Sequence, residues 1–209
     1  MPQRMASAMY QMRSGPGTLN SVSSVPEDPA AALLRDKPAI RDLEHITNDL
    51  CIVAPATPYD PATGLGMLEA RPVPAEARCP VCGMFPARYP RWAAQTVFKD
   101  GAAHFFDSPV DLFAFLERVD RHDRHYTLND VAVSFVSDFE TGQWIEARHA
   151  FFVHGSNALG PMRDADLPAF ASRKAADALI RSRGGKALTF AEITPELVRS
   201  LSRNLHHRH

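Results

Sequence analysis

Hydrophobic and polar residues alternate regularly only in the second part of the chain. Residues 92–98 are rich in β-formers, Asp100-Gly101 is a typical hairpin turn, and residues 103–106 supply a return strand. Ser108 then has the features of a helix N-cap, because proline occupies the first helical position and an acid follows in the first turn. The apolar face expected for this helix consists of Leu112, Phe113, Phe115, Leu116 and Val119.

The same order of elements is predicted again further along the chain. The expected elements are a strand over 131–139, a turn at 140–142, a return strand over 144–153, a helix opening at Asp166-Leu167-Pro168 and ending at Gly184-Gly185, a strand over 187–190 and a last helix over 195–205. Strand, turn, strand and helix therefore occur twice. This order predicts an α+β fold with two small related lobes.

Proline interrupts the first third of the chain. Ten of the 17 prolines precede residue 75, and proline supports neither a regular strand ladder nor a long helix. We predict a Pro-rich, partly disordered, irregular arm over residues 1–75, with one short helix between about 30 and 50. The folded domain is expected over 76–209, with lobes over about 79–125 and 130–205.

Composition bounds the class of protein and its partners. The 209 residues are 45% hydrophobic and 22% charged, which is typical of a soluble globular protein. The formal net charge of −1 gives no field that would attract nucleic acid, and no nucleic-acid partner is expected. No stretch has the roughly 20 apolar residues of a membrane span. No signal peptide is visible, so a cytoplasmic location and a signal outside this sequence are both compatible with it.

The candidate chemistry lies in Cys79-Pro80-Val81-Cys82-Gly83-Met84, which offers three sulfur donors within six residues. Thiolates and thioethers are soft ligands, and Cu(I) prefers soft ligands. Gly83 has no Cβ, so the backbone can turn tightly there and return Met84 toward the ion. The sequence predicts a Cu(I) site at Cys79, Cys82 and Met84 in a metal carrier that is not an enzyme.

Two alternatives remain open for the same cysteines. A structural zinc module needs four ligands, usually from a second Cys/His pair, and no second Cys-x-x-Cys exists. A thiol-disulfide oxidoreductase would use Cys79 and Cys82, but needs a helix after the motif, which Pro86 and Pro90 oppose. The third cysteine, Cys51, is interpreted as a small apolar residue.

Several short motifs give the chain a resemblance to a known family. They are Cys82-Gly83-Met84, Tyr89-Pro90-x-Trp92-Ala93-Ala94-Gln95, Phe98-x-Asp100-Gly101, Phe105-Phe106-Asp107, Asp111-Leu112-Phe113, Val136-x-Asp138-Phe139-x-Thr141-Gly142-x-Trp144-Ile145-x-Ala147, Gly160-Pro161-Met162, Ala169-Phe170 and Gly184-Gly185. In this order the chain, from about residue 78 to about 190, resembles the NosL family of nitrous oxide reductase accessory proteins.

The resemblance implies a copper-binding protein of two small ββαβ lobes, distantly like organomercurial lyase in fold. Such a protein would carry Cu(I) to a recipient copper enzyme or its assembly machinery, by resemblance nitrous oxide reductase in denitrification. It implies Cys82 and Met84 as ligands and Met162 as a weaker candidate, while Cys79 rests on its own chemistry. It also implies a periplasmic or cell-envelope location. Family members are usually anchored through a lipidated cysteine, for which Cys51 is a poor candidate, so membrane association is expected only through a signal not seen in this chain.

Three histidines are further candidates for closing the site. His104 is expected to be a structural residue within its strand, with copper ligation as the alternative. His149 and His154 flank a predicted strand end that leads toward Met162. Imidazole is an acceptable ligand for copper, so either could contribute.

Overall fold

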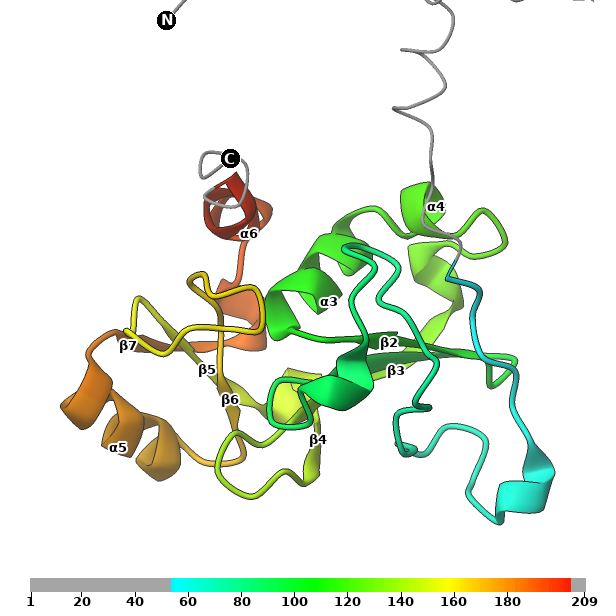
Figure 1. The fold of residues 1–209 in the computed structure, drawn as a ribbon, viewed down its shortest axis with the longest axis horizontal. Helices are drawn as coiled ribbons and strands as arrows, with labels where there is room; N and C mark the ends of the chain where they lie inside the picture. The colour runs from blue at the N-terminus through cyan, green and yellow to red at the C-terminus, as the bar shows by residue number, and fades with distance from the viewer. Residues whose placement is uncertain (1–53, 204–209) are drawn as a thin grey trace, which may run out of the picture. The chain divides into compact units, whose positions relative to one another are not determined.

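The computed structural model describes residues 54–203, and Figure 1 shows how their helices and strands are arranged. The elements are η2 (Pro61–Thr63), η3 (Pro86–Arg88), β1 (Ala94–Phe98), β2 (Ala103–Phe106), α3 (Pro109–Glu117), α4 (Val119–His122), η4 (Leu128–Asp130), β3 (Val131–Ser137), β4 (Trp144–Glu146), η5 (Ala147–His149), β5 (Phe151–His154), β6 (Ala169–Phe170), α5 (Arg173–Arg183), β7 (Lys186–Thr189), η6 (Phe190–Glu192) and α6 (Pro195–Arg203). The helix expected between residues 30 and 50, and Cys51, lie outside the described residues.

Two small antiparallel sheets carry the fold, which confirms the α+β prediction. The first sheet has the order β2-β1-β3-β4 and the second the order β6-β5-β7. The β1–β2 hairpin forms as the sequence predicts. Gly101 takes a φ of +86° at its turn and donates its N–H to the Phe98 carbonyl oxygen at 2.9 Å.

The single return strand expected over 144–153 is wrong. Residues Ala147–His149 form a 3-10 turn, in which the Ala150 N–H donates to the Ala147 carbonyl oxygen at 3.2 Å. This turn interrupts the ladder, so β4 pairs with β3 in the first sheet while β5 pairs with β6 and β7 in the second. The two sheets therefore divide after residue 146.

The helix expected to open at Asp166-Leu167-Pro168 is also wrong at its start. The carboxylate of Asp166 accepts the N–H of Leu167 at 2.7 Å, and the Pro168 carbonyl oxygen accepts the Val153 N–H at 3.0 Å. These bonds keep the chain extended into β6. The helix α5 begins only after Ser172, whose hydroxyl accepts the Ala175 N–H, and it ends at Gly184 as predicted.

The described part of the predicted arm lies against the first sheet. Thr57 forms an antiparallel bridge with Ala103, at the outer edge of β2. Arg71 and the buried Gln95 exchange two hydrogen bonds of 3.1 and 3.0 Å. The chain from residue 54 onward is therefore irregular but attached to the folded domain. The rest of the predicted arm lies outside the described residues and stays a prediction.

One apolar core joins the two sheets through α3. Phe98 and Phe106 of the first sheet, Phe115 of α3 and Phe152 of β5 are fully buried in it. The ring of Phe115 contacts those of Phe98 and Phe106, with centroids 6.4 and 5.1 Å away. This packing holds α3 against β1 and the end of β2.

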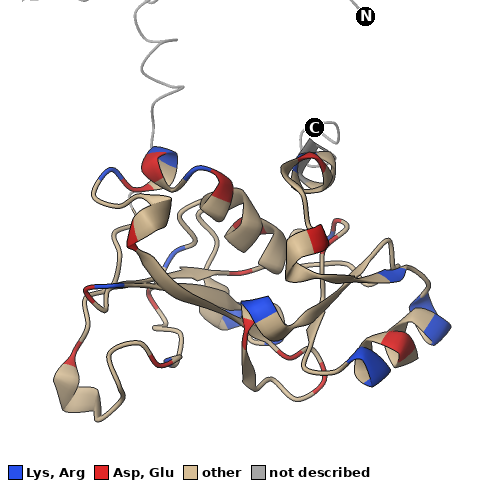
Figure 2. Cartoon of the chain, turned by 180° about the vertical axis from the view of Figure 1, so that it is seen from behind, with Lys and Arg blue, Asp and Glu red and all other residues tan. Residues whose placement is uncertain are grey.

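Charged residues of both signs are spread over the described chain, as Figure 2 shows. The basic residues Arg181, Arg183 and Lys186 are exposed at the end of α5 and the start of β7. No helix among the described residues is long and apolar enough to cross a membrane.

Candidate metal centre

The Cys79–Met84 segment folds into a closed loop. The Gly83 N–H donates to the Cys79 carbonyl oxygen and the Cys79 N–H donates to the Met84 carbonyl oxygen, both at 2.9 Å. Gly83 has a φ of +78°, which a residue with a Cβ adopts only with strain. The expected tight bend is therefore present, and it brings the two cysteines to one side of the loop.

Two carboxylates meet this loop from the junction between β2 and α3. Asp107 directly follows β2, and Asp111 lies in the first turn of α3, where its N–H donates to the Ser108 hydroxyl at 3.2 Å. Both side chains are buried, with 0% of Asp107 and 6% of Asp111 exposed. The helix start expected from the sequence thus also places two acids next to the cysteines.

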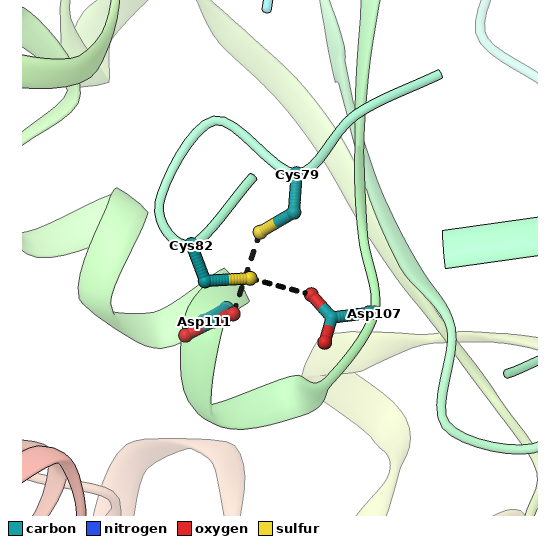
Figure 3. Close-up of side chains that lie close together, drawn as sticks. All are labelled: Cys79, Cys82, Asp107 and Asp111. Atoms are coloured by element: carbon teal, nitrogen blue, oxygen red, sulfur yellow. Dashed lines mark hydrogen bonds between the residues drawn. The ribbon is translucent and has the colours of Figure 1, made fainter. Parts of the chain in front are cut away.

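The four side chains converge on one point, as Figure 3 shows. One donor atom from each of Cys79, Cys82, Asp107 and Asp111 lies within 4.8 Å of all the others. The sulfur of Cys79 is 3.3 Å from Asp111 Oδ2, and the sulfur of Cys82 is 3.0 Å from Asp107 Oδ1. Two thiols and two carboxyls at this spacing have the dimensions of a coordination shell.

The electrostatics of the cluster favour a bound cation. Burial raises the pKa of Cys79, and the Cys79 sulfur together with burial raises that of Cys82. Burial and the charge of Asp107 raise the pKa of Asp111 to about 7. Oδ2 of Asp107 is buried and has no hydrogen-bond partner among the described residues. A bound positive ion would stabilise the thiolate and carboxylate forms of these residues, which burial otherwise disfavours. It would also give Asp107 Oδ2 an interaction partner.

Access to the cluster differs between its two cysteines. Cys79 is fully buried and packs in the main core, whereas Cys82 is half-buried. Cys82 is therefore the least buried of the four residues.

The two predicted methionine ligands come from different loops of the fold. Met84 closes the cysteine loop and is half-buried. Met162 is 41% exposed and borders, together with Asp111, a cavity of about 20 Å³. Met162 lies on the loop that joins β5 to β6 and shares this cavity with Asp111.

The three candidate histidines lie outside the four-residue cluster. His104 is buried, and its Nε2 is 2.9 Å from Asp123 Oδ2, as expected of a structural residue. His149 is exposed and lies 3.5 Å from Glu146, and His154 is half-buried at the end of β5. Among the described residues, the group that could hold a metal contains no imidazole.

Sequence reasoning missed two contributors to the site. Asp107 and Asp111 are four residues apart across a predicted strand–helix junction, and that spacing was the available signal.

The geometry disfavours dithiol redox chemistry. An attacking thiol of that class needs a lowered pKa, usually from a helix N-terminus, and here burial raises the pKa of Cys79. The motif is followed by the three-residue 3-10 turn Pro86–Arg88, as the prolines predicted. The zinc alternative gains support, because Asp107 and Asp111 bring the number of candidate ligands to four.

Comparison with known proteins identifies similar chains. A family model described as NosL matches residues 70–198, which is more than half of the chain. The crystal structure of the copper chaperone NosL from Shewanella denitrificans is 28% identical, covers 62% of this chain and 98% of its own, and superposes with a TM-score of 0.51. The solution NMR structure of apo-NosL from Achromobacter cycloclastes is also 28% identical, covers 50% and 87%, and has a TM-score of 0.38. No curated protein matches the chain.

Proposed function

The chain belongs to the NosL family, and on that premise we propose that it carries copper, as Cu(I), and hands it to a recipient protein without catalysing a reaction. The observation that carries the proposal is the convergence of the Cys79 and Cys82 sulfurs beside a carboxylate oxygen of Asp107 that has no hydrogen-bond partner in the described part of the chain. Soft thiolates are the donors that Cu(I) prefers. The similar Shewanella protein is described as a copper chaperone.

In this proposal Cys79 and Cys82 are the main ligands, and Met84 and Met162 are the thioether candidates. Met84 lies on the same loop, and Met162 borders a small cavity together with Asp111. The thiols must lose their protons when Cu(I) binds. Asp107 and Asp111, at 3.0 and 3.3 Å from the two sulfurs, are placed to accept hydrogen bonds or protons from them.

Release of the ion would take place at Cys82. The buried Cys79 is shielded, but Cys82 is half-buried, so a ligand of the recipient can approach the metal from that side. Transfer of the ion through an intermediate bound by both proteins needs only one ligand position that the recipient can reach. By resemblance, we propose nitrous oxide reductase or its assembly machinery as the recipient and the cell envelope as the location.

A Cu(I) competition assay tests the binding site. The metal-free protein competes with a bicinchoninate chelator for Cu(I) under anaerobic conditions. We expect Cys82→Ser to lower the affinity by about 100-fold, equivalent to about 2.8 kcal/mol, and Met84→Leu by less. Cys51→Ser is the matched control and should leave the affinity unchanged. Unchanged affinity in Cys82→Ser would refute the copper site.

The four-donor geometry favours a zinc site as the second candidate. Zinc accepts carboxylate oxygen as well as thiolate, whereas Cu(I) binds carboxylate weakly. Asp107→Asn should therefore lower zinc affinity strongly and leave most Cu(I) affinity intact. Stoichiometric zinc in protein purified without added metal, with loss of fold on chelation, would favour the zinc module over the copper carrier.

A further inference from the structure

Strand β3 has an open edge over its first half. On one side it pairs with β1 along its length, but on the other side β4 pairs only with residues 135–137. Residues 131–134 are accordingly half-buried. Among the described strands, none pairs with this stretch on the β4 side.

The ladder register shows which backbone groups face that open side. Ser137 donates its N–H to the Ala93 carbonyl oxygen at 2.9 Å, and bonding to the same neighbour recurs every second residue in an antiparallel pair. Val133 and Phe135 therefore bond to β1. The N–H and carbonyl oxygen of Ser134 point to the open side, while its hydroxyl contacts that of Thr96 at 3.0 Å.

An apolar groove runs beside this edge. It has a volume of about 370 Å³ and lies between residues 131–134, the second half of α3, η6 and the start of α6. Its apolar walls include Phe113, Leu116, Phe190 and Ile193. Leu128 at the border is 59% exposed, so apolar surface here continues into solvent.

Two charged side chains, Glu117 and Arg148, line the groove. Glu117 forms an ion pair with Arg199 of α6. Arg148, on η5, is exposed and forms no ion pair among the described residues. The groove therefore presents one unpaired guanidinium beside an unpaired strand edge.

From these three features we propose that the groove binds an extended peptide segment of a partner protein, which adds a short strand to the β3 edge. The partner backbone would exchange hydrogen bonds with Ser134, and alternate apolar side chains would enter the groove. An acidic side chain of the segment would pair with Arg148. Neither a compact apolar molecule nor a helix would satisfy the open backbone groups.

The position of the groove suggests a use, and this step rests on the proposed function. Helix α3 carries Asp111 in its first turn and Glu117, which lines the groove, at its end. Six residues of α-helix span about 9 Å. A recipient bound at this edge would thus be held close to the metal cluster.

Selection from a phage-displayed library of random seven-residue peptides tests the proposal on the full chain. We expect enriched sequences to alternate apolar residues with polar ones and to contain an aspartate or glutamate. A synthetic peptide of the enriched sequence should bind in fluorescence anisotropy and slow hydrogen exchange of the Ser134 amide by at least about tenfold. The absence of an enriched class, or binding without protection of Ser134, would overturn the proposal.

Matched variants separate strand addition from other forms of binding. Ser134→Pro removes the outward N–H, which none of the described strands uses, and should weaken peptide binding at least about tenfold. Ser134→Ala also loses the hydroxyl but keeps the N–H, and should bind as the wild type does. Arg148→Glu should change the selected peptides from acidic to basic, and it tests the proposal even if the proline variant unfolds.

Two other occupants would give different results. Pairing of two copies through this edge would appear as a concentration-dependent dimer in sedimentation that Ser134→Pro abolishes, and would overturn the proposal. Binding of apolar dye with equal affinity in Ser134→Pro and wild type, without peptide binding, would also overturn it. Cu(I) affinity should be unchanged in Ser134→Pro, so the copper proposal and the peptide proposal fail independently.

Discussion

Asp166 offers a direct test of how burial controls the stability of this fold. Its carboxylate Oδ1 accepts the N–H groups of Leu167 and Val110 at 2.7 and 3.4 Å, and so ties the loop before β6 to the first turn of α3. Burial, followed by the charge of Asp111, raises its pKa from 3.8 to about 7. Asp166→Asn keeps Oδ1 as the acceptor and removes the charge.

The expected magnitude follows from proton linkage. Between pH 3.8 and about 7 the folded protein keeps the Asp166 proton while the unfolded chain releases it, so rising pH favours unfolding. Each tenfold step in proton concentration contributes about 1.4 kcal/mol, and the full interval gives about 4 kcal/mol. Wild type should therefore lose up to about this amount between pH 4 and pH 8 through Asp166 alone, and the asparagine variant should not.

Urea unfolding of the metal-free protein at pH 4, 6 and 8 measures the effect. We expect Asp166→Asn to match wild type near pH 4 and to exceed its free energy of unfolding by about 4 kcal/mol at pH 8. Asp120→Asn is the control, because that side chain is 67% exposed, and its curve should follow that of wild type. Equal pH dependence in wild type and Asp166→Asn would refute the assignment of a buried, protonated acid.

Two further substitutions test how the structure around the site is stabilised. His104→Ala removes the buried imidazole that contacts Asp123 at 2.9 Å, and it should lower the free energy of urea unfolding by about 3 kcal/mol. The control is His125→Ala at the same carboxylate, which should cost under about 0.5 kcal/mol because that side chain is 89% exposed. Equal costs would contradict a structural role for His104. Gly160→Ala places a Cβ against the carboxylate of the buried Asp166 and should cost about 2 kcal/mol in the same assay. A variant as stable as wild type would show that the loop bearing Met162 is free to move.

Local signals predicted the first hairpin and the helix that follows it. Asp100-Gly101, Ser108 and Pro109 each specify backbone geometry within a few residues, and the structure has the turn, N-cap and helix at those positions. The same signals failed after residue 146. No local feature distinguishes a continuous strand from one broken at Ala147, because the break depends on β4 and β5 pairing with different sheets.

The start of α5 shows a second limit of local reasoning. Asp166-Leu167-Pro168 has the composition of a helix N-terminus, and so does Ser172 six residues later. The choice is made by distant partners, because the Asp166 carboxylate bonds to Val110 and the chain after it pairs with β5. A capping residue therefore predicts a helix start only when its side chain does not hydrogen-bond to another element of the fold.

The acids of the candidate site illustrate why a metal-binding motif was only half visible in the sequence. The loop from Cys79 to Met84 is recognisable in the sequence, because three sulfur-containing residues and a glycine within six residues are typical of a metal-binding loop. Asp107 and Asp111 have an ordinary structural explanation at a helix start, and only the contact of that helix with the cysteine loop gives them a second role. Because those acids are hard ligands and the cysteines soft, the same cluster can discriminate between metals by which half of it binds. Copper delivery would depend on the sulfur ligands alone, whereas a structural zinc ion would bind all four groups. The change in Cu(I) affinity and in zinc affinity caused by Asp107→Asn therefore distinguishes a copper carrier from a structural zinc site.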